Sequence, residues 1–250
     1  RDDVESRGLG DVYKRQEQWG YVATYHFESH GNPIIRHIYT ADPAAMVEND
    51  TLWLFTGHDM EGRQKGYVMR DWQLFSTTDM THWTQHPCPL TVFDFKWATS
   101  KQAYAGHVAK RNDKYYFYVS TNGSGIGVAV SDKITGPYKD AIGKPLLTRQ
   151  DCFDSKHGWC CIDSDIHRIA ISTEHPFEEA PWLHKYQGRY YLTYASGWPE
   201  KIAYAIADNA MGPYKTQGVI SEIAGNSNTT HPAIVQYKGC LLYTSDAADE

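Results

Sequence analysis

The chain has 250 residues, of which 41% are hydrophobic and 14% aromatic, and its 24 basic against 30 acidic residues give a net charge of −6. That apolar fraction suffices for one sizeable core. No apolar run reaches the roughly 18 residues that a membrane-spanning helix requires. Nucleic acids and anionic membranes attract clustered positive charge, and no basic stripe is present. The composition therefore predicts an aromatic-rich globular protein with neither nucleic acid nor membrane as a partner.

The two ends of the chain resemble translated DNA adapter. Residues 11–16 can be encoded by GAT GTG TAT AAG AGA CAG, and the reverse complement of that DNA, read from its second base and continued with T, encodes residues 240–245. We therefore expect residues 1–16 and 240–250 to be non-native, with a native acidic tail as the alternative. A signal peptide would be lost with the native N-terminus, so its absence leaves open the secreted or periplasmic location that we favour.

The clear segments along the chain are short, rich in β-branched and aromatic residues, and bounded by Gly, Pro, Asn or Asp. Several alternate with a period of two, as half-buried antiparallel strands do. No segment holds a helical period over a dozen residues, so the sequence predicts an all-β fold. The expected strands include residues 51–55, 115–119, 126–130, 190–194 and 202–206.

Two stretches repeat the same pattern of strands. Residues 114–120 and 189–195 are each followed by an apolar strand that ends in Asp. Each copy then reaches a Gly-Pro-Tyr sequence, at Gly136 to Tyr138 and at Gly212 to Tyr214. A repeated antiparallel sheet of this size is typical of a β-propeller blade.

The spacing of the repeats is irregular. A weaker copy of the pattern runs through residues 52–55 and 74–76 and ends at Asp79. Asp79 and Asp132 are 53 residues apart, whereas Asp132 and Asp208 are 76 apart. The second interval is too long for one blade and about 30 residues too short for two. We therefore expect most of a third blade to be missing near residues 164–166, with a long insertion loop as the alternative. The last blade is expected to stop at Gly239, before the strands that would close the ring.

Three acidic positions stand just before blade repeats. They occur in Ala41-Asp42-Pro43, in Ile162-Asp163-Ser164 and in Glu179-Ala180-Pro181-Trp182, where Glu178 precedes Glu179. A propeller gathers such positions from its innermost strands onto one axis, so we expect the acids to converge. An Asp beside Pro is also a common turn residue, which is the alternative for each position taken singly.

These acids lie within motifs whose order and spacing resemble one enzyme family. The motifs are Asn32-Pro-Ile-Ile-Arg36, Tyr39-Thr-Ala-Asp-Pro43, Thr56-Gly-His-Asp59, Trp97-Ala98, Tyr104-Ala-Gly-His107, Glu179-Ala-Pro-Trp182 with His184-Lys185, Pro199-Glu-Lys-Ile-Ala203, and Gly225-Asn-Ser-Asn-Thr-Thr-His-Pro232. Together they cover nearly all of residues 32–239, and they resemble glycoside hydrolase family 43. The resemblance implies a five-bladed β-propeller that acts on arabinose- or xylose-containing glycans, with residues 17–239 as an incomplete catalytic domain.

The resemblance also implies catalytic roles. Asp42 corresponds to the general base, Glu179 to the general acid, and Asp163 to the acid that orients and tunes Glu179. Hydrolysis with inversion needs one carboxylate to activate water and one carboxylic acid to protonate the leaving oxygen, about 6.5–9.5 Å apart. A nearby carboxylate keeps the acid protonated by raising its pKa. Glu178 is the rival for the acid, and alignment with Ala-Pro-Trp favours Glu179.

Other residues correspond by resemblance to pocket positions. His58, Asp59, Trp97 and His107 are expected to bind substrate, although Trp97 is equally well read as a core residue. His231 matches a histidine that neighbours a bound calcium ion or its waters in many members. Calcium prefers oxygen ligands, so His231 would hold a water molecule and the ion would be structural. No organic cofactor is expected.

The sequence departs from the family where the third blade should be. The family usually reads Ile-Asp-Pro, a valine-rich strand and an Asp-Asp-Gly turn, whereas here Asp163 is followed almost at once by Ile166-His-Arg-Ile. We expect an inverting α-L-arabinofuranosidase or β-xylosidase, which the missing blade could inactivate. One alternative is a non-catalytic or degenerate glycan-binding propeller. Another is a five-bladed fructosidase with a covalent intermediate, which would need carboxylates about 5–5.5 Å apart.

Overall fold

The computed structural model describes residues 23–60, 68–99, 102–121, 125–148, 151, 174–223, 225 and 227–244. Asp163 and the expected adapter segment 1–16 lie outside this part of the chain. The described residues form sixteen strands and one 3₁₀ turn, Val92–Asp94, and none of them is in an α-helix. The all-β prediction is therefore confirmed. No helix among them could cross a bilayer.

Four antiparallel sheets contain all the strands, and we name them sheets A to D in chain order. In sheet A the order is β1 (Tyr25–Glu28), β5 (His82–Gln85), β4 (Met69–Thr77), β3 (Thr51–Asp59) and β2 (Ala44–Glu48), and β6 (Leu90–Thr91) also pairs with β4. In sheet B the order is β10 (Lys139–Asp140), β9 (Gly125–Ser131), β8 (Lys114–Thr121) and β7 (Ala103–Arg111).

The second half of the chain repeats this plan. In sheet C the order is β11 (Glu179–Tyr186), β12 (Arg189–Ser196), β13 (Lys201–Ala207) and β14 (Lys215–Ser221). Sheet D pairs β15 (Ala233–Tyr237) with β16 (Cys240–Thr244). β16 lies beyond Gly239, within residues 240–250, whose non-native origin stays a prediction.

Each sheet contains a hairpin, β2–β3, β7–β8, β11–β12 or β15–β16, that is closed by the same kind of two-residue turn. The turn residues are Asn49-Asp50, Asn112-Asp113, Gln187-Gly188 and Lys238-Gly239, and all eight have positive φ, between 46° and 82°. Positive φ at both central positions defines a type I′ turn, whose twist matches that of the flanking strands. These turns set the register between the two strands of each hairpin.

The Gly-Pro-Tyr sequences occupy matching places after β9 and β13. Both Gly–Pro peptide bonds are cis. The hydroxyl of Tyr138 donates to the carbonyl oxygen of Ile134 at 3.1 Å, and that of Tyr214 donates to Ala210 at 2.8 Å. The two tyrosines are buried, so each closes the outer part of its sheet. The predicted repeat is therefore a structural repeat.

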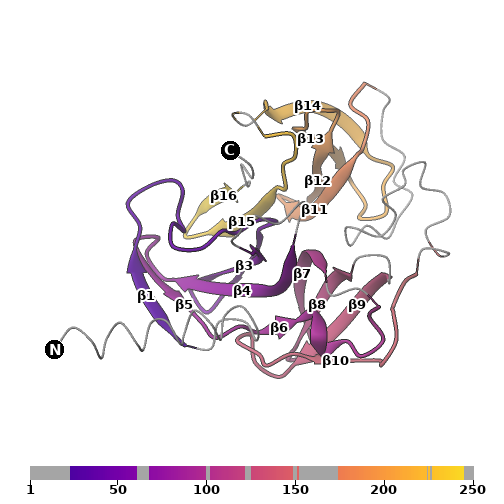
Figure 1. Cartoon of the computed structure of the whole chain (residues 1–250). Coiled ribbons are helices and arrows are strands. Elements are labelled where there is room, and N and C mark those ends of the chain that lie inside the picture. The colour runs from indigo at the N-terminus through magenta and orange to yellow at the C-terminus, as the bar shows by residue number, and fades with distance from the viewer. Residues whose placement is uncertain are drawn as a thin grey trace.

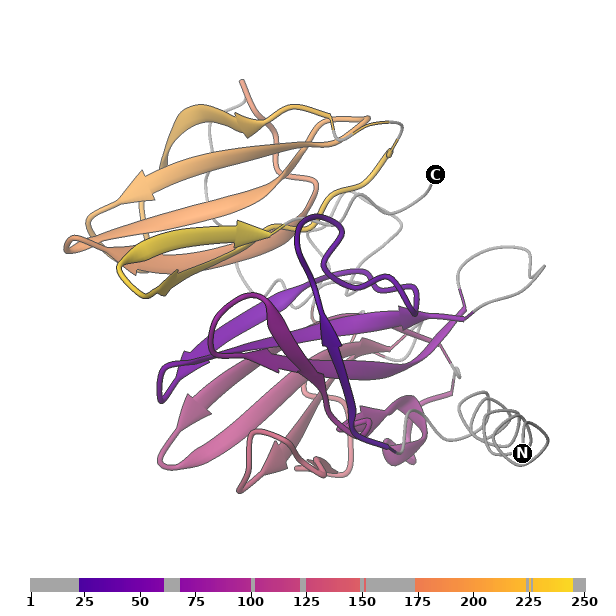
Figure 2. The same ribbon diagram turned by 90° about the vertical axis from the view of Figure 1, so that its left-hand side faces the viewer.

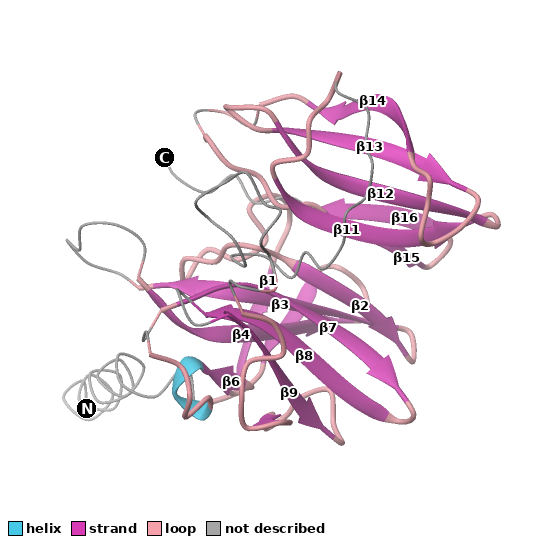
Figure 3. Cartoon of the chain, turned by 90° about the vertical axis from the view of Figure 1, so that its right-hand side faces the viewer, coloured by secondary structure: helices cyan, strands magenta, loops and turns pink. Residues whose placement is uncertain are grey.

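The strands that begin these four hairpins, β2, β7, β11 and β15, are called the first strands here, and they contact one another in series. β2 contacts β7 on one side and β15 on the other, and β15 contacts β11. Figure 1 shows the sheets arranged around these strands, and the turned views of Figures 2 and 3 separate sheets A and B from sheets C and D. The largest apolar cluster joins Trp72 of β4, Phe117 of β8 and Trp182 of β11. The N-terminal ends of the first strands are where we expect the active site.

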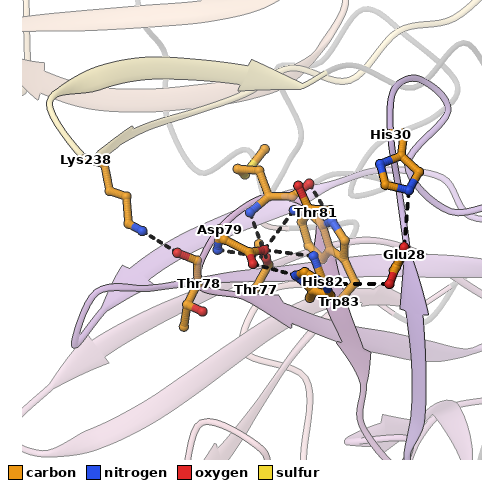
Figure 4. Close-up of polar contacts among 10 residues, drawn as sticks. Glu28, His30, Thr77, Thr78, Asp79, Thr81, His82, Trp83 and Lys238 are labelled. Atoms are coloured by element: carbon orange, nitrogen blue, oxygen red, sulfur yellow. Dashed lines mark hydrogen bonds and ion pairs between the residues drawn. The ribbon is translucent and has the colours of Figure 1, made fainter.

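Sheet D is tied back to sheet A. The ammonium of Lys238, in the β15–β16 turn, donates to the carbonyl oxygen of Thr78 in the β4–β5 turn (Figure 4). The hydroxyl of Tyr237 donates to the carbonyl oxygen of Asp50 at 3.3 Å. The β4–β5 turn is itself braced by Asp79, whose carboxylate accepts from the amides of Thr81 and His82 at 2.9 and 2.8 Å. The last sheet therefore packs on a well-defined surface of the first.

Candidate active site

Asp42 lies just before β2, on a segment that runs against the end of β3. The amide of Gly57 donates to the carbonyl oxygen of Ala41 at 2.7 Å, and the amide of Asp59 donates to Tyr39 at 3.3 Å. A Cβ at Gly57 would lie 3.4 Å from that Ala41 oxygen and 2.5 Å from the sulfur of Met69. Glycine at this position therefore leaves room for the Met69 side chain. Asp42 itself has a φ of 52°, a left-handed conformation that Asp tolerates better than most residues.

His231 approaches Asp42 from the loop that leads into β15. Its Nδ1 lies 2.8 Å from Oδ1 of Asp42, and the two side chains are only 15% and 16% exposed. Because a carboxylate accepts, Nδ1 is the donor, and the contact fixes the orientation of the Asp42 carboxylate. The structure therefore brings together two of the sequence-predicted site residues, from opposite ends of the described chain.

Glu179 is the first residue of β11. The strand register shifts between Glu179 and Trp182, and Ala180 within this bulge has a φ of 56°. A bulge re-aims the side chains beside it and is common next to active sites. The amide of Glu178 donates to the carbonyl oxygen of Ala195 at 3.0 Å, which anchors the segment before the bulge. Glu179 is half-buried at the rim of sheet C.

The starts of the first strands lie at one end of the molecule. The Asp42–His231 contact joins the starts of β2 and β15. Three residues after Glu179, the indole of Trp182 donates to the carbonyl oxygen of Ile234 at 2.7 Å, and Ile234 is the second residue of β15. The starts of β11 and β15 are therefore also close. The structure thus joins Asp42 to His231, and the convergence of Glu179 with them stays a prediction.

A buried chain of hydrogen bonds crosses sheet A and ends at His58. Nδ1 of His58 lies 2.9 Å from Oδ1 of Asp71, which also accepts a hydrogen bond from the side-chain amide nitrogen of Gln73 at 2.5 Å. Gln85 donates to Gln73 at 2.9 Å, and Nε2 of His37 donates to the Gln85 oxygen at 2.8 Å. A fully satisfied network of this kind holds its members rigidly. His58 is therefore fixed as an Nδ1–H donor at the edge of sheet A that carries Asp42.

His107 lies between two sheets. Its ring, on β7, meets Trp182 of β11 edge-on, with 4.8 Å between ring centroids. Burial lowers the pKa of His107 to about 4, so the ring is neutral at physiological pH. The structure thus places His107 where it joins sheet B to sheet C.

Trp97 and Asp59 have different surroundings. The indole of Trp97 donates to Asp140 of β10 at 2.8 Å and its ring packs against Phe95. Since β10 is the strand of sheet B farthest from β7, this anchor belongs to the outer part of that sheet. Asp59 is the last residue of β3, next to His58. A substrate-binding role for these residues stays a prediction.

Sequence reasoning missed two buried carboxylates. Asp71 orients His58, and Glu200 accepts a hydrogen bond from the loop that carries His231. Asp71 and Gln73 are polar residues two positions apart within a buried strand, a pattern that signals a polar network on one face. Glu200 lies within the Pro199-Glu-Lys-Ile-Ala203 motif, but no sequence pattern indicated a role for its carboxylate. The predicted pKa modulator, Asp163, lies outside the described residues.

The side chains around His231 bear on the expected calcium ion. Within the described residues no group of three or more His, Cys, Asp and Glu side chains could hold a metal ion. Calcium takes six to eight oxygen ligands, and Nδ1 of His231 is directed at Asp42. These residues do not fit a calcium ion ligated directly by the protein.

The chain is similar to known proteins over most of its length. The family model "Glycosyl hydrolases family 43" matches residues 30–161. The "Xylosidase/arabinosidase" of Bacteroides ovatus is 27% identical over 274 residues, covering 80% of this chain and 83% of that protein. The "Beta-D-galactofuranosidase xynD" of Aspergillus niger is 27% identical over 230 residues, covering 74% of this chain and 66% of that protein, so the chain spans just under two thirds of its length.

Solved structures are similar as well. CoXyl43, a GH43 β-xylosidase/α-arabinofuranosidase from a compost microbial metagenome, was solved with xylotriose in a calcium-free form. It superposes with a TM-score of 0.74 at 25% identity, covering 88% of this chain and 89% of that one. The RS223 β-xylosidase gives a TM-score of 0.68 at 27% identity, covering 82% and 85% of the two chains.

Proposed function

Because the chain belongs to glycosyl hydrolases family 43, whose members hydrolyse O-glycosyl bonds, we propose that it cleaves arabinose- or xylose-containing plant glycans with inversion. Glu179 would protonate the leaving oxygen, and Asp42 would take a proton from the attacking water. The observation that carries the proposal is the Asp42–His231 contact of 2.8 Å at the start of β2. It gives a carboxylate a fixed orientation where two other first strands begin.

The reaction needs only groups that this chain supplies. The O–H bond of Glu179 breaks as the glycosidic oxygen takes its proton, and the bond from that oxygen to the anomeric carbon breaks with it. Water attacks the anomeric carbon from the opposite face and loses a proton to Asp42, so the configuration inverts. His231 stabilises Asp42 in the orientation that receives the proton. No organic cofactor takes part in this proposal.

The substrate class rests on the similar proteins. The relatives from Bacteroides ovatus and Humicola insolens are both named as xylosidase/arabinosidase. CoXyl43 is described as both a β-xylosidase and an α-arabinofuranosidase. We propose the same two activities for this chain. A non-catalytic glycan-binding function is not favoured, because the similar proteins are named as enzymes.

We also propose that sheets A to D are blades of a five-bladed propeller whose third blade is largely missing. The alignment with the Bacteroides ovatus enzyme runs over 274 positions but takes up only 80% of this 250-residue chain, so that enzyme has residues without a counterpart here. This supports a deletion within the chain. Asp163 would stand at the remnant of that blade and modulate Glu179. A calcium ion near His231 remains a proposal, and it would need water as ligand.

The proposal is tested with 4-nitrophenyl α-L-arabinofuranoside and β-D-xyloside. We expect the unaltered chain to hydrolyse at least one of them, with the inverted anomer as first product by proton NMR. Asp42→Asn and Glu179→Gln should each remove turnover without lowering the melting temperature, whereas Glu178→Gln should retain it. Retention of configuration, or normal turnover by Asp42→Asn, would contradict the assignment. Turnover lost in Glu178→Gln but kept in Glu179→Gln would exchange the two glutamates.

A further inference from the structure

Glu200 is a buried carboxylate that the proposed mechanism does not use. It lies directly before β13, after the cis Trp198–Pro199 peptide, and it is 3% exposed. A buried charge is costly unless hydrogen bonds compensate it. A carboxylate kept at such a position therefore has a specific partner.

That partner is the backbone beside His231. The amide of Thr230 donates to Oε2 of Glu200 at 2.8 Å. The amide of Glu200 donates in turn to the carbonyl oxygen of Asn228 at 3.0 Å. Glu200 thus binds the loop at two places, on a segment that leads directly into His231. Thr230 is itself buried, so water does not compete for its amide.

The contacts form a path from sheet C to the carboxylate of sheet A. Glu200 holds Thr230, the next residue is His231, and Nδ1 of His231 donates to Asp42 at 2.8 Å. Sheets C and D lie side by side in all three views, with the loop between them (Figures 1 to 3). Hydrogen bonds from an amide to an ionised carboxylate are short and strong, which suits a fixed anchor.

We propose that Glu200 is a positioning residue for the general base. By anchoring Thr230 it holds the His231 imidazole at the distance from which Nδ1 can donate to Asp42. The inference rests on the proposed function, since it is Asp42 acting as a base that gives the anchor its catalytic consequence. Glu200 acts only through His231 and does not touch substrate.

The test compares Glu200→Ala with two further Glu200 variants and one control. Glu200→Gln keeps an oxygen that can accept from Thr230, and Glu200→Asp keeps the charge but shortens the reach by one methylene. The control is Glu222→Ala, which removes an exposed carboxylate just after β14 that pairs with Lys201 at 2.7 Å. Should Glu200→Ala fail to fold, Glu200→Asp provides the same readout.

The first readout does not depend on activity. The Nδ1–H proton of His231 and the amide of Thr230 are followed by NMR in the whole chain. We expect Glu200→Ala and Glu200→Asp to lose the His231 Nδ1–H signal and to speed exchange of the Thr230 amide at least about tenfold, while Glu222→Ala changes neither. Both signals unchanged in Glu200→Asp would overturn the proposal.

The second readout separates a base defect from general loss of structure. We expect kcat per folded molecule to fall up to about 100-fold in Glu200→Ala, with KM within about twofold. The loss should be equal for dinitrophenyl and phenyl glycosides, since activation of water does not depend on the leaving group. Glu179→Gln should lose most on the phenyl glycoside. Glu200→Gln should lose less than Glu200→Ala.

Outcomes distinguish the inference from the proposed function. Full kcat per folded Glu200→Ala molecule, with Asp42→Asn inactive, would overturn the inference alone. No hydrolysis by the unaltered chain, together with the expected NMR changes, would count against the proposed function while leaving the anchor of His231 established.

Discussion

The amide of Gly57 donates to the carbonyl oxygen of Ala41 at 2.7 Å, so the residue before Asp42 is hydrogen-bonded directly to β3. This backbone contact determines where the Asp42 carboxylate can stand. On the same residue, a Cβ at position 57 would lie 2.5 Å from the buried sulfur of Met69.

Gly57→Ala should therefore destabilise the fold at the site. Overpacking of this kind costs about 1–3 kcal/mol, and we expect the free energy of unfolding in urea to fall by that amount. In a Met69→Ala background the same substitution should cost less, because the sulfur is gone. Equal costs in the two backgrounds would show that the contact with Met69 is not the cause.

His231→Ala should impair catalysis more than stability. Without the Nδ1 donor, the Asp42 carboxylate loses its fixed orientation, and a small misplacement of a catalytic group can lower the rate about 100-fold. We expect kcat on an aryl glycoside to fall up to that extent with little change in KM. His82→Ala, at an exposed histidine on the outer strand β5, serves as control. A His231→Ala enzyme with normal kcat would rule out this role.

Asp71→Ala should unfold more easily than the unaltered chain. It removes the acceptor of His58 and Gln73 within a buried network, and each buried donor left without a partner costs about 1–3 kcal/mol. Urea denaturation measures the loss. Asp208→Ala removes a carboxylate that is 92% exposed and pairs with Arg189 at 3.3 Å, and it should change stability by less than about 1 kcal/mol. Similar losses in the two variants would argue against a cooperative network.

Stability should decrease in mild acid because of His107. Its pKa is lowered to about 4 by burial, whereas an unfolded histidine titrates near 6.5. Between these values the unfolded chain binds more protons, so stability rises with pH and is lost as the pH falls below about 6.5. Protonation of this histidine should lower the free energy of unfolding by about 2 kcal/mol between pH 6.5 and pH 5.

His107→Phe keeps a ring against Trp182 but cannot take up a proton. We expect its free energy of unfolding, measured in urea at pH 7 and pH 5, to fall less than that of the unaltered chain. His86 and His184, whose pKa values burial also lowers, remain in both proteins and do not affect the comparison. An equal fall in both proteins would place the sensitivity elsewhere.

Local patterns predicted much of the fold. The period-two alternation of the strands and the two Gly-Pro-Tyr repeats reappear as antiparallel strands and as two matching tyrosine closures. The turns at Asn49-Asp50 and Asn112-Asp113 carried a readable signal too, since Asn and Asp tolerate positive φ. These features could be predicted because each depends on residues near one another in the chain.

The site was predictable only in part. Asp42 and Glu179 could be chosen because each stands at the head of a blade repeat, and His231 because its motif resembles the family's. The structure joins Asp42 to His231. Glu200 and Asp71 could not be chosen in this way, because their partners are a loop backbone and a histidine on another strand. The role of Trp97 was ambiguous from sequence, since an aromatic residue serves equally in a pocket or against a sheet. The structure shows that its indole is hydrogen-bonded to Asp140.

The ties between sheet D and sheet A have a kinetic consequence. The hydroxyl of Tyr237 reaches the carbonyl oxygen of Asp50 across 187 positions of sequence, and His231 reaches Asp42 at the other end of the same two strands, β15 and β2. The hairpins can form early from local turns, whereas contacts of such separation form late because of the entropy of closing so long a loop. During refolding, β-sheet signal should thus precede catalytic competence, which is complete only when the last sheet has docked on the first.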